Sequence, residues 1–125
     1  MVSAVNARRQ RERRRLGAAA EERAARLLQQ AGCEILARNY RCRMGELDII
    51  ARRQQLLIIA EVRLRSSPGY GGAAESITAA KRTRMVRATR HLLASRPALQ
   101  RLLVRFDAIL LAGADGELEW IEGAF

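Results

Sequence analysis

The chain has 125 residues, which suffices for one domain with a hydrophobic core. Its 23 Lys and Arg residues outnumber its 13 Asp and Glu residues, which favours polyanionic partners, although a solvated basic surface would carry the same charge. Two cysteines and one histidine are too few for a four-ligand zinc site. No apolar run reaches about 18 residues and no apolar leader is visible, so we expect a cytoplasmic protein.

Residues 1–15 are rich in Arg, and we expect them to form a disordered basic arm ahead of a single domain, residues 16–125. The first helix is predicted over residues 16–31 and ends at Gly32. Its buried stripe recurs at helical spacing: Ala20, Ala24, Leu27, Leu28 and Ala31. Glu21 lies at the edge of this stripe. It would either reach toward a sheet or remain an exposed carboxylate, and the periodicity leaves both open.

Three strands are predicted next, and two of them contain acids where apolar residues are expected. Residues 34–40 form the first, with Ile35 and Ala37 on one face. The second contains Gly45-Glu46-Leu47-Asp48-Ile49-Ile50, and the third runs over residues 56–64 and contains Glu61-Val62-Arg63. Alternation places Glu46, Asp48 and Ile50 on one face of the second strand, opposite Leu47 and Ile49. Both strands are otherwise apolar on both faces, so carboxylates there are costly without a cation or hydrogen bonds.

The second and third strands are predicted to form a hairpin. A two-residue loop, Gln54-Gln55, would place Asp48 opposite Glu61 and Glu46 opposite Arg63, whereas a four-residue loop would place Glu46 opposite Glu61. Either register keeps the acids on one face. Because opposed like charges destabilise a sheet, a hard divalent cation between them would reverse the sign of the interaction.

A second helix is predicted over residues 76–95. Its inward residues are Met85, Ala88, Thr89 and Leu92, and a neighbouring face carries Lys81, Arg84, Arg87 and His91. That basic face is either a track for a nucleic-acid backbone or a solvated helix face. A strand over residues 102–111 would then lie parallel to the third strand, and residues 117–121 would add an edge strand. Asp107 is expected to be structural and to pair with an arginine.

These motifs resemble the restriction-endonuclease-like superfamily, whose signature is an acid followed by acid-x-lysine across a β-hairpin. The match is closer to the YraN-like family of bacterial proteins, which are similar to Holliday-junction resolvases. The resemblance spans about residues 17–111 and is carried by Gly17, Glu21, Ala24, Leu28, Gly32, Asn39, residues 45–50, residues 61–65, Lys81 and residues 105–107. It implies an α/β fold with a mixed central sheet of about five strands, an antiparallel hairpin plus one parallel βαβ unit, flanked by two main helices.

The resemblance also implies a metal-dependent endonuclease that hydrolyses phosphodiesters in DNA, with branched or junction DNA as one candidate substrate. Asp48 and Glu61 would bind Mg²⁺ or Mn²⁺ together with the backbone carbonyl of Val62, and Glu21 would take part through water. Arg63 would act in catalysis, and Glu46 is a secondary candidate. The nucleic-acid-binding residues would be Lys81, Arg84, Arg87 and Arg65. Junction-cutting relatives act as dimers, so a homodimer is a further expectation.

One departure from the signature keeps other functions open. Arg63 stands where the superfamily has lysine; arginine stays protonated and binds phosphate as a planar fork, so it cannot serve as a base. Lys81 is a candidate substitute, although the sequence does not show that it reaches the site. The alternatives are a non-catalytic nucleic-acid-binding protein on a nuclease scaffold and an interaction protein whose acids form ordinary salt bridges with Arg63 and Arg65.

Overall fold

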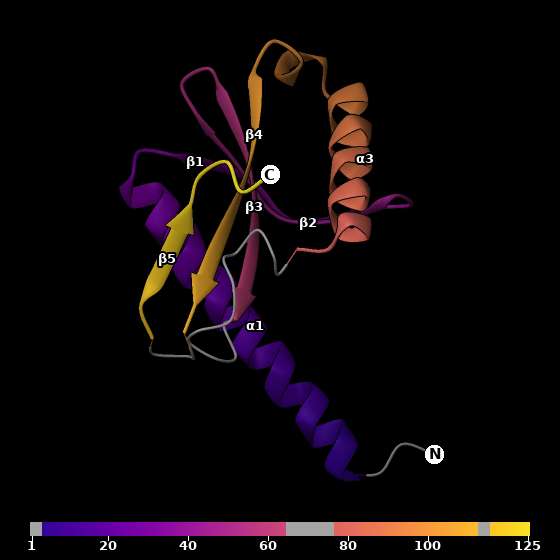
Figure 1. Ribbon diagram of the computed structural model, residues 1–125, viewed down its shortest axis with the longest axis vertical. Coiled ribbons are helices and arrows are strands. Elements are labelled where there is room, and N and C mark those ends of the chain that lie inside the picture. Colours follow the sequence, from indigo (N-terminus) through magenta and orange to yellow (C-terminus); the bar gives the residue numbers. More distant parts are fainter. Residues whose placement is uncertain (1–3, 65–76, 113–115) are drawn as a thin grey trace.

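A mixed five-stranded sheet with a long helix on each face forms the body of the protein in the computed structural model, which describes residues 4–64, 77–112 and 116–125 (Figure 1). The elements in chain order are helix α1 (Ala4–Gln30), strands β1 (Glu34–Cys42), β2 (Gly45–Arg53) and β3 (Leu56–Leu64), helix α3 (Ala79–Ser95), the 3-10 turn η1 (Pro97–Leu99), and strands β4 (Leu103–Leu111) and β5 (Leu118–Ile121). The strands lie side by side in the order in which they occur along the chain. This is the α/β architecture that the sequence predicted.

The β2–β3 hairpin has the predicted two-residue loop. Arg53 pairs with Leu56 across Gln54-Gln55, and Gln54 has a φ of 55°, in the left-handed region that tight hairpin loops require. The antiparallel pairs continue in this register as far as Ile49 and Ala60, where the pairing of β2 with β3 stops. Residues 45–48 of β2, which include Asp48, are therefore not held to β3 by a ladder.

Strands β3 and β4 are parallel, as predicted, and are connected through α3. Their register runs from Leu56 opposite Leu103 to Leu64 opposite Leu111, and β5 then pairs antiparallel with β4 at the edge of the sheet. A parallel pair needs a long crossover, and α3 provides it while covering one face of the sheet.

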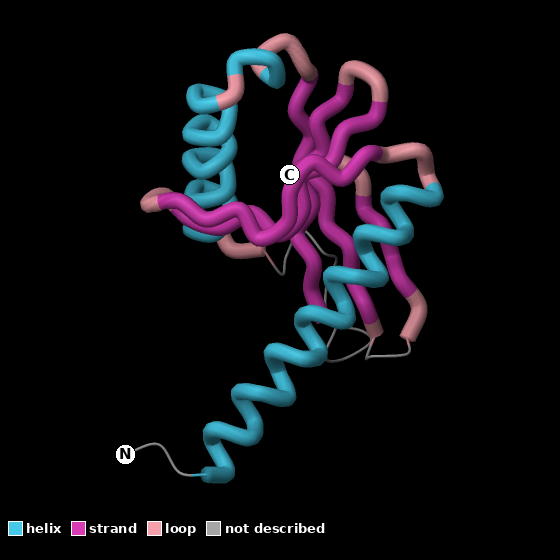
Figure 2. Tube along the Cα trace, turned by 180° about the vertical axis from the view of Figure 1, so that it is seen from behind, coloured by secondary structure: helices cyan, strands magenta, loops and turns pink. Residues whose placement is uncertain are grey.

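The two long helices cover opposite faces of the sheet (Figures 1 and 2). A layer of hydrophobic side chains lies beneath each of them. On the α1 side the buried residues include Ala24, Ala25, Leu28, Ile49, Ala51, Ile58 and Ala60. On the α3 side they include Leu47, Ile50, Leu57, Ile59, Met85, Ala88 and Leu92. Burial on both faces explains why β2 and β3 are apolar in nearly every position, and the inward residues predicted for α3 are confirmed.

Three local predictions are wrong. Ile35 and Ala37 do not share a face, because a β-bulge between them shifts the register of β1 against β2: Ile35 packs on the α1 side and Ala37 on the α3 side. Leu47 packs on the α3 side together with Ile50, so strict alternation along β2 fails where that strand leaves β3. Helix α1 begins at Ala4 rather than near residue 16, and its N-terminal half extends beyond the sheet (Figure 2).

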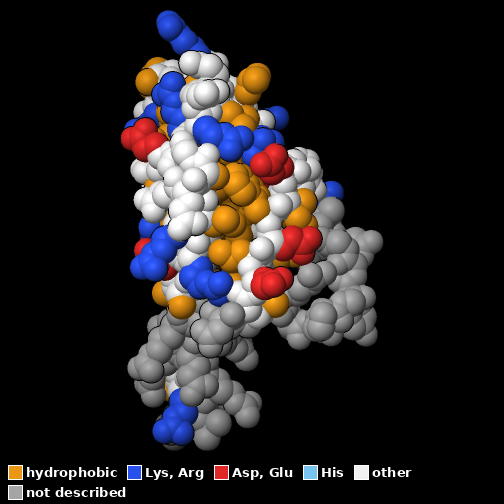
Figure 3. Space-filling view, turned by 90° about the vertical axis from the view of Figure 1, so that its left-hand side faces the viewer, with side chains coloured by type: hydrophobic (Ala, Val, Ile, Leu, Met, Phe, Trp, Pro, Cys, Tyr) orange, Lys and Arg blue, Asp and Glu red, His pale blue; other side chains and the backbone are white. Residues whose placement is uncertain are grey.

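The side of the molecule where α1 and β5 lie carries a band of hydrophobic side chains bordered by charged residues (Figure 3). A shallow hollow of about 210 Å³ on the surface is lined there by Leu27 and Leu118 and by polar and basic residues of α1. Within the described residues, neither helix is long and apolar enough to cross a membrane.

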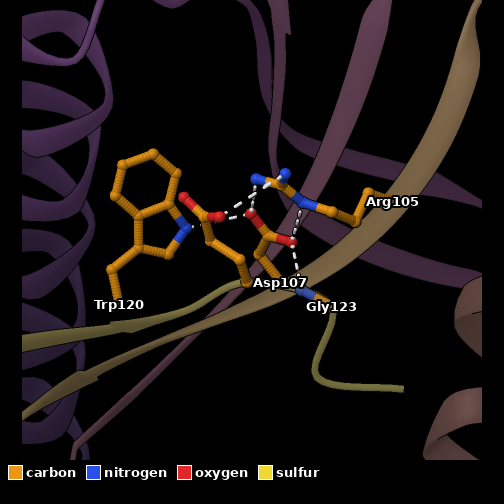
Figure 4. Close-up of polar contacts among 5 residues, drawn as sticks. Arg105, Asp107, Trp120 and Gly123 are labelled. Carbon is orange, nitrogen blue, oxygen red and sulfur yellow. Dashed lines mark hydrogen bonds and ion pairs between the residues drawn. The ribbon is translucent and has the colours of Figure 1, made fainter.

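Asp107 is fully buried on β4 and anchors the C-terminal end of the chain, as the sequence predicted (Figure 4). Arg105 donates to both of its carboxylate oxygens at 2.8 Å, and the indole of Trp120 and the backbone N–H of Gly123 each donate at 2.9 Å. Burial opposes ionisation of Asp107, but these donors outweigh it and hold the pKa of Asp107 below its usual range. The network therefore joins β4 to β5 and to the residues that follow β5, where Arg105 also lies 3.7 Å from Glu122.

Candidate metal-binding site

The gap that opens where β2 leaves β3 contains a cavity of about 340 Å³. Asp48 of β2 and residues 61–64 at the end of β3 line it from the sheet, and α1 lines it with Gly17, Ala20 and Glu21. Because Gly17 has no side chain and Ala20 only a methyl group, α1 leaves space beside the carboxylates. Three of the acids that the sequence singled out, Glu21, Asp48 and Glu61, thus share one cavity.

The side chain of Asp48 accepts a hydrogen bond from β3 at the point where the ladder between β2 and β3 has ended. Its Oδ2 accepts the backbone N–H of Val62 at 2.9 Å. In a strand, the N–H and C=O of one residue point to the same side, so the carbonyl of Val62 also faces the side on which Asp48 lies. The Asp48 carboxylate and the Val62 carbonyl, both predicted metal ligands, therefore present oxygens toward the same gap between β2 and β3.

Glu61 is the most deeply buried acid of this site, with 5% of its side chain exposed. One oxygen, Oε1, lies 3.2 Å from the ammonium Nζ of Lys81 on α3, and the other, Oε2, is buried without a hydrogen-bond partner. Burial, followed by the negative charge of Asp48, raises the pKa of Glu61 to about 7, although Lys81 acts in the opposite direction. The carboxyl groups of residues 48 and 61 therefore lie close together, as predicted, on one cavity.

Glu21 lines the cavity from α1. Of the two positions that helical periodicity left open, the structure therefore shows the one directed toward the sheet. Its Oε2 accepts a hydrogen bond from the side-chain amide of Asn39 at 3.1 Å. Burial raises the pKa of Glu21 above its usual range, and the nearby charge of Asp48 adds to the effect, while Asn39 opposes it. Asn39 itself has a φ of 51°, a conformation that asparagine adopts more readily than most residues.

The donor set fits a hard divalent cation with two direct carboxylates. Among residues 4–64, 77–112 and 116–125, no three Asp, Glu, His or Cys side chains form a group that would hold a metal ion. Asp48, Glu61 and the Val62 carbonyl offer oxygen ligands, and Glu21 lines the same cavity. The unpartnered, buried Oε2 of Glu61 is the feature that a cation would satisfy.

The remaining predicted residues are distributed around the cavity. Arg63 lines it beside Glu61. Glu46 pairs in the ladder with Arg41, whose Nε lies 3.5 Å from its carboxylate, so the expected position of Glu46 opposite Arg63 is wrong: β2 has already left β3. Arg65 lies outside the described residues.

A second, more open hollow lies on the outer face of α3, against the tip of the β1–β2 hairpin. It measures about 470 Å³ and is lined by Met44, Arg87, Arg90 and His91. The hydroxyl of Tyr40 lies 2.6 Å from Nδ1 of His91 and links the hairpin to the helix. Three of the four lining side chains are basic or imidazole groups, so this groove suits an anionic ligand.

The hairpin tip is held close to α3 by a glycine. A Cβ atom on Gly45, whose φ is +156°, would lie 3.2 Å from Cβ and 3.3 Å from the backbone oxygen of Arg84. Arg84 therefore contributes its backbone to this contact, while its side chain is exposed beside the groove.

Sequence reasoning could not establish two contacts of this site. It placed Lys81 among the nucleic-acid-binding residues and named it as a candidate substitute without showing that it reaches, whereas its amine contacts Glu61. It gave Asn39 no part in positioning Glu21. Neither contact leaves a periodic signal, because each joins elements that are separated by many residues in the chain.

Comparison with known proteins places these residues in a family. Residues 20–111 match the model of "Uncharacterised protein family UPF0102". A UPF0102 protein of Nitrosomonas europaea is 48% identical over 110 residues, which cover 87% of this chain and 92% of the relative. A UPF0102 protein of Dechloromonas aromatica is 46% identical over 109 residues, 87% of each chain. The chain therefore belongs to the UPF0102 family, the YraN-like family that its motifs resemble.

Proposed function

We propose that this protein is a Mg²⁺- or Mn²⁺-dependent endonuclease that hydrolyses phosphodiester bonds in DNA. The observation that carries the proposal is the buried, unpartnered Oε2 of Glu61 beside the Asp48 carboxylate in an open cavity. Two carboxylates in contact are unfavourable unless a proton or a cation lies between them, and oxygen ligands of this kind select hard divalent ions.

Asp48 and Glu61 would hold the ion together with the Val62 carbonyl, and Glu21 would act through water. When bound, a divalent ion supplies Lewis-acid chemistry, because it lowers the pKa of water and neutralises charge on phosphate oxygens. Arg63 lines the same cavity, and its guanidinium is suited to a fork of hydrogen bonds with a phosphate. Asn39 holds Glu21 in position.

The basic face of α3 offers a path for the rest of the DNA strand. Arg84, Arg87 and the groove with Arg90 and His91 follow one another along the helix from the cavity toward the hairpin. Residues 81 and 91 are separated by about 15 Å along the helix axis, a length over which a nucleic-acid backbone carries several negative charges. DNA in the cytoplasm is the expected substrate, and a homodimer would suit a branched substrate with two equivalent strands.

Cleavage of defined DNA substrates tests the proposal. We expect the wild-type protein to cut at least one of linear, single-stranded and four-way-junction DNA in Mg²⁺ or Mn²⁺, and Asp48→Asn to abolish both cutting and Mn²⁺ uptake. Glu34→Gln is the matched control, because Glu34 is an exposed carboxylate on β1. Cutting by Asp48→Asn at the wild-type rate would contradict the proposal.

Arg63 favours one other candidate, a DNA-binding protein that has kept the nuclease scaffold without cleavage. An arginine at this position retains phosphate binding but lacks the chemistry of a lysine. If this candidate is right, both the wild-type protein and Arg63→Lys bind all the DNA substrates, and the binding weakens as the salt concentration rises. Neither protein forms a cleavage product in Mg²⁺ or Mn²⁺. Cleavage by the wild-type protein would exclude it.

A further inference from the structure

We infer that Lys81 on α3 supplies the ammonium group of this site, in place of a lysine at strand position 63. The inference rests on the proposed function and adds to it a specific residue from a different element of the fold. Lys81 is the only lysine of the chain, and its Nζ lies 3.2 Å from Oε1 of Glu61.

The position of Lys81 is fixed by the local structure at the start of α3. It lies in the first turn of α3, where its backbone N–H donates to the N-cap side chain of Thr78 at 3.1 Å. Its side chain is 29% exposed, in contrast to the 77% exposure of Arg41 in the surface pair with Glu46. Its ammonium therefore lies against a carboxylate that itself lines the cavity.

Arg63 and Lys81 would then divide two tasks. Arg63 carries a planar, delocalised charge, which suits a bidentate grip on phosphate, whereas an ammonium is a compact point charge with three donors. In phosphodiester hydrolysis, a water oxygen bonds to phosphorus while the bond from phosphorus to the leaving sugar oxygen breaks; water loses a proton and the leaving oxygen gains one. The charge of Lys81 would stabilise the negative charge that builds up on the phosphoryl oxygens, and no proton passes through it.

The same geometry predicts an effect on metal binding without any substrate. Because Lys81 is a cation in contact with a proposed metal ligand, it competes with the divalent ion for Glu61. Removing its charge should therefore tighten Mn²⁺ binding while it slows cleavage. A salt bridge that served only stability would not combine these two effects.

The test compares four proteins in Mn²⁺ titrations and in DNA cleavage: wild type, Lys81→Met, the swap variant Lys81→Met/Arg63→Lys, and Arg96→Met. Arg96 is exposed at the opposite end of α3, roughly 22 Å away along the axis, and controls for loss of one positive charge. We expect Lys81→Met to bind Mn²⁺ at least about threefold more tightly and to cleave at least about 100-fold more slowly. The swap variant should recover at least about tenfold of that loss, because residue 63 lines the same cavity.

The outcomes separate this inference from the function on which it rests. If the wild-type protein takes up Mn²⁺ and cleaves DNA, and Lys81→Met does both to the same extent, the inference is overturned and the proposed nuclease function stands. Weaker Mn²⁺ binding by Lys81→Met would also overturn it, since Lys81 would then support the ion and not compete with it. A wild-type protein that neither binds Mn²⁺ nor cuts DNA would refute the proposed function, and the role of Lys81 with it.

Discussion

Replacing Glu61 by glutamine should make the metal-free protein more stable at alkaline pH. The pKa of Glu61 is raised from 4.5 to about 7 in the folded protein, chiefly by burial and by Asp48. In the unfolded chain the carboxyl loses its proton near pH 4.5, so that the folded state holds an extra proton between these two values. Wild-type stability is therefore lost as pH rises through this window, and Glu61→Gln, which carries no charge, should not share the loss.

The magnitude follows from the interval between the two pKa values. From 4.5 to about 7, at about 1.4 kcal/mol per pKa unit, the ionised carboxylate costs the folded state about 3 kcal/mol above pH 7. The glutamine amide carries no charge, so neither burial nor the charge of Asp48 penalises it as pH rises. Glu61→Gln should thus equal the wild type near pH 4 and exceed it by about 3 kcal/mol near pH 8.

Urea unfolding in the presence of a chelator, at several pH values between about 4 and 8, measures this difference. Mn²⁺ should reverse it at the alkaline end, because an ion that binds only the folded wild type stabilises that protein and not the variant. Glu34→Gln is the control, as an exposed carboxylate on β1 whose change should stay within about 0.5 kcal/mol. A constant difference between Glu61→Gln and wild type across the whole pH range would refute this account of the pair.

Three further predictions concern the parts that support the site. Asp107→Asn should lower the free energy of unfolding by about 3 kcal/mol, because it breaks a buried ion pair with Arg105; a loss below about 1 kcal/mol in urea unfolding would show that the pair contributes little. Gly45→Ala should cost about 1–2 kcal/mol, measured as a lower Tm, because its Cβ would crowd Arg84 at a positive φ. Arg87→Met should weaken binding of all DNA sequences alike and reduce the slope of log affinity against log salt by about one; an unchanged slope would place the DNA elsewhere.

The local pattern of apolar and polar residues was sufficient to predict much of the fold. The apolar runs of β2 and β3 predicted strands buried on both faces, and the polar Gln54-Gln55 step between them predicted the hairpin in its observed register. The inward face of α3 followed from helical spacing, and the connection between β3 and β4 predicted their parallel pairing. These features depend on a period of two or 3.6 residues, which neighbouring residues carry by themselves.

The geometry of the candidate site depended on structural features that no sequence period encodes. A single extra residue in β1 forms the bulge that separates Ile35 from Ala37, and the same sequence pattern would describe a regular strand. The departure of β2 from β3 beyond Ile49 opens the cavity and places Glu46 beside Arg41, because hydrogen-bond ladders end where the packing of the whole sheet requires it, not where a residue type changes.

The sequence by itself determined that two acids of one hairpin would lie on a common side and that a cation or proton would have to compensate them. The tertiary structure alone decided which groups meet them: the docking of α1 brings Glu21 to the cavity, and the docking of α3 brings Lys81 to within 3.2 Å of Glu61. Twenty residues separate positions 61 and 81 in the chain. Contacts at such separations are set by how helices pack on a sheet, through surface complementarity that the spacing of residues along one element does not encode.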